Sequence, residues 1–128
     1  MNILVDTHVL LAALQGRLGD QFPGIARALT QPGVNGAVSV VSLWEIAIKQ
    51  RLGKLEPGMP LEDVVPFCEK SGLSILPIKA AHVIATVEPE PATRDPFDRL
   101  LLAQCEVEGL ALATVDRALV SHRLSLTT

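Results

Sequence analysis

Four acidic residues that lie far apart in the sequence are the side chains best suited to chemistry: Asp6, Glu45, Asp98 and Asp116. Asp6 and Asp116 each follow a short apolar run, the pattern of a strand buried on both faces of a parallel sheet. Glu45 and Asp98 fall in the first turns of expected helices. Because parallel strands end, and the helices after them begin, at one edge of a sheet, we expect the four carboxylates to converge at that edge.

Carboxylates gathered at one partly dry edge predict a bound cation. Without one, they would repel one another and raise each other's pKa values. Oxygen ligands without His or Cys favour magnesium or manganese over zinc. Such an ion lowers the pKa of a bound water and neutralises the charge that develops on phosphate oxygens. The four acids therefore predict hydrolysis of a phosphodiester without a covalent intermediate.

Two of the acids also have a structural interpretation as helix-capping groups. Ser42 and Glu45 have the spacing of a capping box, in which Glu45 would bond back to the Ser42 backbone. Asp95 is expected to cap the helix that follows it, and Asp98 would partly compensate the dipole of that helix. Capping therefore accounts for Asp95 fully and for the other two in part.

The acids at the strand ends differ in how easily structure alone explains them. Asp116 could cap a short helix that begins at Arg117. Asp6 is harder to explain in this way, since an acid that ends a buried strand loses hydration unless something compensates it. Asp6 is thus the strongest candidate for a functional role.

Short apolar runs alternate with helical patterns along the whole chain. We expect strands at 2–5, 37–40, 73–76 and 110–114, with a possible fifth at 123–126. We expect helices at 7–14, 22–30, 42–52, 61–71, 80–87, 96–108 and 117–121. Loops are expected at 54–60, which contains Pro and Gly, and at 88–93, which contains two Pro residues. This alternation predicts an α/β fold in which helices cover both faces of a parallel sheet.

Composition fits one folded domain over residues 1–128. The chain is 48% hydrophobic and 20% charged, which argues against disorder. No run approaches the roughly 18 apolar residues of a membrane helix, and the first residues lack the pattern of a secretory signal. We therefore expect a soluble, cytoplasmic protein.

Other possible sites are weakly supported. Cys68 and Cys105 lack the spacing of a zinc site and are expected to be buried thiols. The net charge of −3 argues against a broad surface for nucleic acids. A local basic rim is still possible, because basic residues lie close in sequence to the acids: Lys49, Arg51, Lys54, Arg94, Arg99, Arg117 and Arg123.

Four segments carry a resemblance to a known family. Residues 3–11, 42–49, 94–104 and 112–118 closely resemble PIN-domain ribonucleases, specifically the VapC-like toxins of prokaryotic toxin–antitoxin pairs. The order and spacing of the segments match over almost the whole chain. The resemblance implies a three-layer α/β/α fold with a central parallel sheet of four to five strands. It also implies RNA cleavage dependent on Mg²⁺ or Mn²⁺, a homodimer, and inhibition by a VapB-like antitoxin whose tail covers the active site.

The resemblance also assigns roles to individual residues. It implies that Asp6, Glu45, Asp98 and Asp116 form the acidic quartet that holds the metal, with secondary roles for Thr7, Asp95 and Thr114. Ser39 and Ser42 are candidates to border the pocket. The chain departs from many relatives at Ala12 and Ala13, where an aromatic side chain is common, and at Thr93, where a His is common. We expect neither departure to touch the quartet.

Two other classes of function compete with a nuclease. A scaffold that keeps the fold and binds RNA or a protein partner would be favoured by loss of an acid, and none is lost. A phosphatase or receiver domain would use Asp6 as a phosphoryl acceptor. The phosphatase pattern has a second acid two residues after the acceptor, where this chain has His8. The receiver pattern has an aspartate at the end of a central strand and a lysine near a later one, and neither Ser74 nor Leu76 provides such a site.

Overall fold

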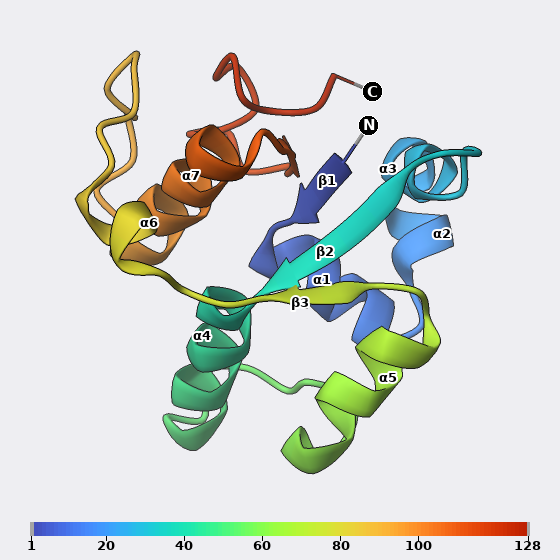
Figure 1. Ribbon diagram of the computed structural model, residues 1–128. Helices are drawn as coiled ribbons and strands as arrows, with labels where there is room; N and C mark the ends of the chain where they lie inside the picture. Colours follow the sequence, from blue (N-terminus) through green and yellow to red (C-terminus); the bar gives the residue numbers. More distant parts are fainter. Residues whose placement is uncertain (1, 128) are drawn as a thin grey trace.

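The computed structural model describes residues 2–127. Four parallel strands form one sheet in the order β3-β2-β1-β4. The strands are β1 (Asn2–Val5), β2 (Asn35–Ser39), β3 (Ser74–Leu76) and β4 (Ala111–Ala113). The helices are α1 (Thr7–Leu14), α2 (Leu18–Gln21), α3 (Pro23–Leu29), α4 (Val40–Arg51), α5 (Val64–Lys70), α6 (Ala80–Ile84) and α7 (Pro96–Glu108), with a 3₁₀ turn η1 (Leu61–Asp63) before α5 (Figure 1).

Each face of the sheet packs against its own set of helices. Ile3 and Val5 of β1 point to the face covered by α1, α3 and α5. Leu4 points to the opposite face, where it joins the buried leucines of α7. Alternate residues of one short strand are therefore buried on both sides, which explains its continuous apolar run. The arrangement confirms the three-layer α/β/α fold with a parallel sheet.

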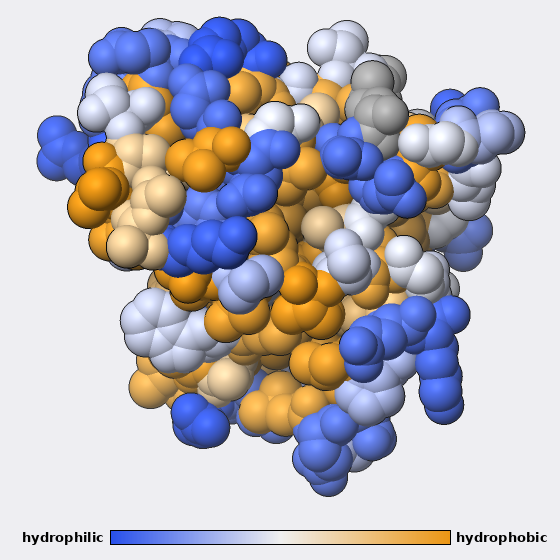
Figure 2. All heavy atoms as spheres, viewed as in Figure 1, coloured by the Kyte–Doolittle hydropathy of each residue, from blue (hydrophilic) through white to orange (hydrophobic). Residues whose placement is uncertain are grey.

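The outer strand β3 is less well covered than the central strands. Ile75 and Leu76 are only partly buried. Apolar side chains gather across the middle of the face shown in Figure 2, where β3 runs in Figure 1.

The interior thiols of Cys68 and Cys105 are both free and buried, as expected, and burial raises the pKa of Cys105 to about 12.

The start of α4 differs from the sequence prediction. β2 ends at Ser39 and α4 begins at Val40, two residues before the predicted start. The helix is capped by Ser39, whose hydroxyl accepts a hydrogen bond from the Val41 N–H at 3.0 Å. The capping-box interpretation of Ser42 and Glu45 is therefore wrong. Strand and helix join without a loop, so the serine directly at the junction becomes the cap.

Regular structure is also shorter than predicted near the C-terminal end. Helix α6 ends at Ile84, not 87, because Ala85 is extended. Residues 117–121 form turns and not a helix. Segment 123–126 contributes one parallel bridge, from Ser125 to Leu112, and not a fifth strand. The short α2 was not predicted at all.

Helix α7 occupies the predicted residues. Asp95 caps its start, Pro96 occupies the first turn, and Gly109 ends it with a φ of 70°. A side chain is strained in that left-handed conformation, so glycine is favoured there. None of the helices within residues 2–127 combines the length and apolar character needed to span a membrane.

Candidate functional site

Asp6 is fixed at the carboxyl end of the central strand β1. Its backbone N–H donates to the Ala113 carbonyl of β4 at 3.0 Å, which continues the pairing of the two strands. Its Oδ1 accepts a hydrogen bond from the Val9 N–H at 2.8 Å and so caps α1. The side chain is only 3% exposed. Asp6 is therefore both a helix cap and a rigidly placed buried carboxylate.

Burial makes the charged form of Asp6 unfavourable. Loss of hydration raises the pKa of Asp6, and the nearby charge of Asp116 raises it further. Hydrogen bonds from the Thr114 side chain and the Val9 backbone act in the opposite direction. The carboxyl edge thus brings Asp6, Thr114 and Asp116 together from β1 and from the end of β4.

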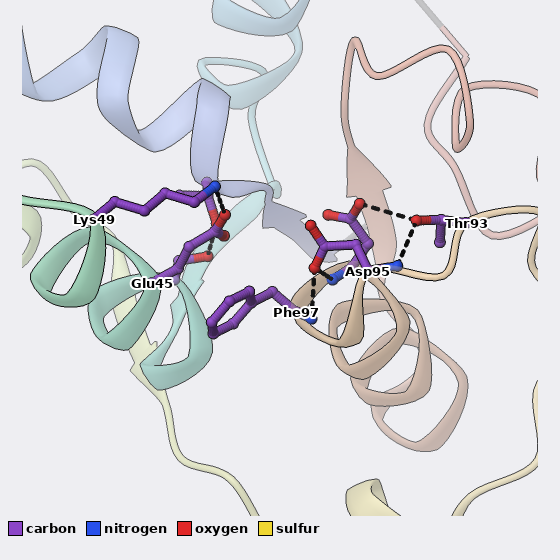
Figure 3. A network of polar contacts seen from close by, with 8 residues as sticks. Glu45, Lys49, Thr93, Asp95 and Phe97 are labelled. Carbon is purple, nitrogen blue, oxygen red and sulfur yellow. Dashed lines mark hydrogen bonds and ion pairs between the residues drawn. The ribbon is translucent and has the colours of Figure 1, made fainter. Parts of the chain in front are cut away.

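Glu45 enters from α4 with both carboxylate oxygens engaged. The Thr7 hydroxyl donates to Oε1 at 2.6 Å, and the same hydroxyl lies 3.0 Å from that of Ser42. Lys49, one helical turn later, pairs with Oε2 at 2.5 Å (Figure 3). Glu45 makes no capping bond to Ser42 and is only 4% exposed. Side-chain contacts to α1, and not a capping role, hold this carboxylate in place.

The start of α7 supplies a second group of acids. Oδ1 of Asp95 accepts hydrogen bonds from the backbone of Phe97 and Asp98, which confirms its role as the helix cap. The Thr93 hydroxyl donates to Oδ2 of Asp98 at 3.3 Å and accepts from the Asp95 N–H at 3.1 Å (Figure 3). Thr93 therefore touches the quartet, contrary to the expectation from sequence.

The contact between α4 and α7 places the two acidic groups near one another. Trp44 packs edge to face on Phe97, with ring centroids 5.5 Å apart. Each ring is next in sequence to an acid, Glu45 on α4 and Asp98 on α7. Figure 3 shows these acid-bearing segments on facing helices. The aromatic pair thus joins the two helix segments that carry Glu45 and Asp98.

Asp116 has a local structural role as well. Its Oδ1 accepts from the Ala118 N–H at 2.8 Å, and its own N–H donates to the Thr114 hydroxyl at 3.1 Å. The residue caps a turn and not the predicted helix. These bonds fix the direction in which the chain leaves β4, and with it the position of the carboxylate.

Electrostatic effects show that the acids lie within range of each other. Burial and the neighbouring charges of Asp95, Asp116 and Glu45 raise the pKa of Asp98 to about 6. Within residues 2–127, however, no three His, Cys, Asp or Glu side chains are placed closely enough to surround one ion. Each quartet carboxylate is held by a hydrogen-bond donor of the protein. The donor set, all carboxylate and hydroxyl oxygen, fits Mg²⁺ or Mn²⁺ in its chemistry.

Sequence reasoning did not single out two contacts of the quartet. Thr93 was seen only as a departure from relatives, and its bond to Asp98 depends on how the loop folds back on α7. Lys49 was noted only as one of several nearby cations, although its spacing of four residues from Glu45 is the signal of a helical ion pair. The hydrogen bond to Glu45, and then the charges of Glu45, Asp95 and Asp98, raise the pKa of Lys49.

Two of the seven basic residues expected at the rim instead hold loops. Arg99 pairs with Glu90 at 2.6 Å and donates to the carbonyls of Thr93 and Pro91. Arg123 pairs with Glu106 and donates to the Glu88 carbonyl. Their guanidinium groups order the connection before α7, which positions Thr93.

The capping role of Asp95 predicts how its variants behave. Asp95→Asn is expected to keep most stability and most activity, because Asn caps a helix nearly as well as Asp. Asp95→Ala should lose about 1 kcal/mol of unfolding free energy, because the bonds from Phe97 and Asp98 have no acceptor. Chemical denaturation and a cleavage assay measure both. A loss of activity in Asp95→Asn as large as in Asp98→Asn, with the fold intact, would contradict the assignment.

The raised pKa of Asp98 predicts how stability without metal depends on pH. The folded chain holds this proton up to about pH 6, whereas the unfolded chain loses it near 3.8. Folding therefore takes up a proton between these values, and this group favours the folded state less as pH rises. In EDTA, Asp98→Asn should be more stable than the parent near pH 8, and the difference should shrink toward about pH 4. Urea denaturation at both pH values tests this; an equal difference at both would speak against it.

Known proteins share this architecture. A search of curated proteins gives no match. Among solved structures, the fold is similar to a chain in the crystal structure of VapBC2 from Rickettsia felis bound to a DNA fragment from their promoter. The TM-score is 0.66 at 15% sequence identity, over 98% of this chain and 96% of that chain. The family model of the PIN domain matches residues 3–123. Together with the sheet edge described above, this match shows that the chain belongs to the PIN domain family.

Proposed function

We propose that this chain is a metal-dependent endoribonuclease of the VapC-like toxin type, which hydrolyses phosphodiester bonds in RNA. Asp6, Glu45, Asp98 and Asp116 would hold Mg²⁺ or Mn²⁺. The observation that carries the proposal is the placement of these acids, from four separate parts of a PIN fold: Asp116 lies within electrostatic range of both Asp6 and Asp98, and Asp98 lies within range of Glu45.

A divalent ion at these oxygens would lower the pKa of a water and neutralise charge on the phosphate. The chain's own residues supply the placement. Asp6 is fixed by the strand pairing and by the α1 cap. Thr7 orients Glu45, and Thr93 orients Asp98, each through a side-chain hydrogen bond. Fixed carboxylates favour catalysis because little reorganisation is needed when charge develops.

The partners follow from the same assignment. We propose a VapB-like antitoxin as the inhibitor, a homodimer of this chain, and a cytoplasmic location, where RNA is available. The similarity of the fold to a chain of the VapBC2 structure supports a toxin–antitoxin pairing.

The direct test is cleavage of cellular RNA. The chain is purified together with the product of the adjacent reading frame, released from it, and incubated with total RNA in Mn²⁺ or in EDTA. We expect discrete new RNA ends with Mn²⁺ and none with EDTA. Binding of RNA without cleavage in either condition would favour the scaffold function instead.

A further inference from the structure

A pocket of about 340 Å³ opens beside Glu45, between α1, α4 and the segment that follows α4. Its polar lining consists of Thr7, His8, Glu45, Lys49, Lys54 and Glu56, so that two lysines face two carboxylates, one of which is already paired with Lys49. Since Thr7 and Glu45 belong to the candidate metal site, the pocket is continuous with that site. We call it the Lys49 pocket.

Two lysines converge on this pocket because of how α4 ends. Gly53 adopts a φ of 71°, and the Lys54 N–H donates to the Lys49 carbonyl at 2.8 Å. This turn brings the chain back so that Lys54 follows Lys49 into the pocket lining. Lys54 is exposed, and the Lys49 side chain is 36% exposed. Both ammonium groups can therefore reach a ligand that enters from solvent.

Lys49 balances Glu45 only while no other cation does so. Its Nζ lies 2.5 Å from Oε2 of Glu45, an oxygen that would otherwise be free to bind a metal. A divalent ion at that oxygen would repel the ammonium group. The flexible side chain of Lys49 would then pair with another anion, and a phosphate group of a bound RNA would supply one.

We propose that the Lys49 pocket binds an RNA phosphate next to the one that is cut, and that Lys49 exchanges between Glu45 in the metal-free protein and this phosphate in the loaded complex. This inference rests on the proposed function. Lys54 binds the same phosphate without contacting Glu45. Lys49 is a positioning residue, and it links metal occupancy to RNA binding.

The first measurement is the affinity for Mn²⁺ without RNA, by titration calorimetry. Lys49→Gln is expected to bind Mn²⁺ about fivefold more tightly, since a competing positive charge has been removed. Lys54→Gln, which lacks the bond to Glu45, should bind Mn²⁺ like the parent. Lys70→Gln on the exposed end of α5 is the matched control. Melts in EDTA confirm that all variants fold.

The second measurement is the affinity for a short labelled single-stranded RNA, at several salt concentrations, with Ca²⁺ in place of Mn²⁺. Each of Lys49→Gln and Lys54→Gln should weaken binding and reduce the slope of log affinity against log salt by about 0.7, the value for one phosphate contact on a single strand. Lys70→Gln should leave the slope unchanged. A lysine that only stabilised α4 would not alter this slope.

The results separate the inference from the proposed function. If the parent binds Mn²⁺ and cleaves RNA but Lys49→Gln matches Lys70→Gln in Mn²⁺ affinity and in salt slope, the pocket inference is wrong and the nuclease assignment stands. If the parent neither binds Mn²⁺ nor cleaves RNA, both are wrong. Tighter Mn²⁺ binding together with a reduced salt slope in Lys49→Gln supports the exchange.

Discussion

Asp6→Asn is expected to lower the rate of RNA cleavage by about three orders of magnitude and to leave the metal-free fold at least as stable as the parent. Stabilisation of transition-state charge by a metal is worth several kcal/mol, and each 1.4 kcal/mol is about a tenfold change in rate. Asn is nearly the same shape as Asp but lacks the negative charge that would bind the ion. Activity and stability should therefore change in different directions.

The expected stability of Asp6→Asn follows from the burial of the Asp6 carboxylate. Its pKa is raised in the folded chain, so at neutral pH the charged carboxylate favours the unfolded state, where it is hydrated. Removing the charge removes that penalty. The Asn side-chain oxygen can still accept the Val9 N–H, so the cap of α1 is kept.

The measurement is a thermal melt in EDTA beside a cleavage assay with Mn²⁺ on the same preparations. Asp20→Asn, at an exposed acid of α2, is the control for losing one negative charge far from the quartet. If Asp6→Asn unfolds, Asp6 is chiefly structural. If it cleaves RNA at the rate of the parent, the metal-nuclease proposal is wrong.

Local signals in the sequence were enough where the structure depends on local bonds. The bounds of α7 were predicted because Asp95, Pro96 and Gly109 each act within one turn of a helix end. The four strands and their parallel sense were predicted because apolar runs alternate with helices. Helix-end residues and apolar runs can both be identified from the sequence of the segment itself, whatever packs against it.

Local signals were insufficient where two residues could serve equally well. Ser39 and Ser42 are both good caps for α4, and the choice depends on how far β2 pairs with its neighbours. Segment 123–126 has a strand-like composition, yet its backbone pairs with β4 only at Leu112, whose N–H donates to the Leu124 carbonyl and whose carbonyl accepts from the Leu126 N–H. Pairing with another segment decides such cases, and pairing is a tertiary property.

The site shows the same division. The sheet topology implied that acids at strand ends would approach one edge, and Asp6 and Asp116 follow β1 and β4 at that edge. The bond from Thr7 that orients Glu45 could not be predicted, because it joins residues far apart in the sequence, whereas the pair of Glu45 with Lys49 follows from their spacing on α4. Thr93 needed the fold of its loop, which Arg99 holds in place.

Added metal is expected to stabilise the parent strongly. Mn²⁺ at about a hundred times its dissociation constant should add about 2.7 kcal/mol to the free energy of unfolding, because it binds the folded chain alone. For a domain of this size, that corresponds to a rise in Tm on the order of 10 °C. Relief of the charge of the neighbouring acids, which together with burial raises the pKa of Asp98, contributes to the affinity for the ion and so sets the concentration at which this rise is reached.

The quartet variants decide where the ion acts. Asp6→Asn and Asp98→Asn should each show a much smaller rise in Tm, because each removes one of the proposed ligands, whereas Asp20→Asn should show the full rise. Ca²⁺, which is larger and tolerates irregular coordination, should raise the Tm of the parent without supporting cleavage. A full rise in both quartet variants would place the metal elsewhere on the chain and leave the acids without their proposed role. A rise confined to chains with all four acids would tie metal binding to the carboxyl edge of the sheet, since these acids share no element of secondary structure and meet only in the folded chain.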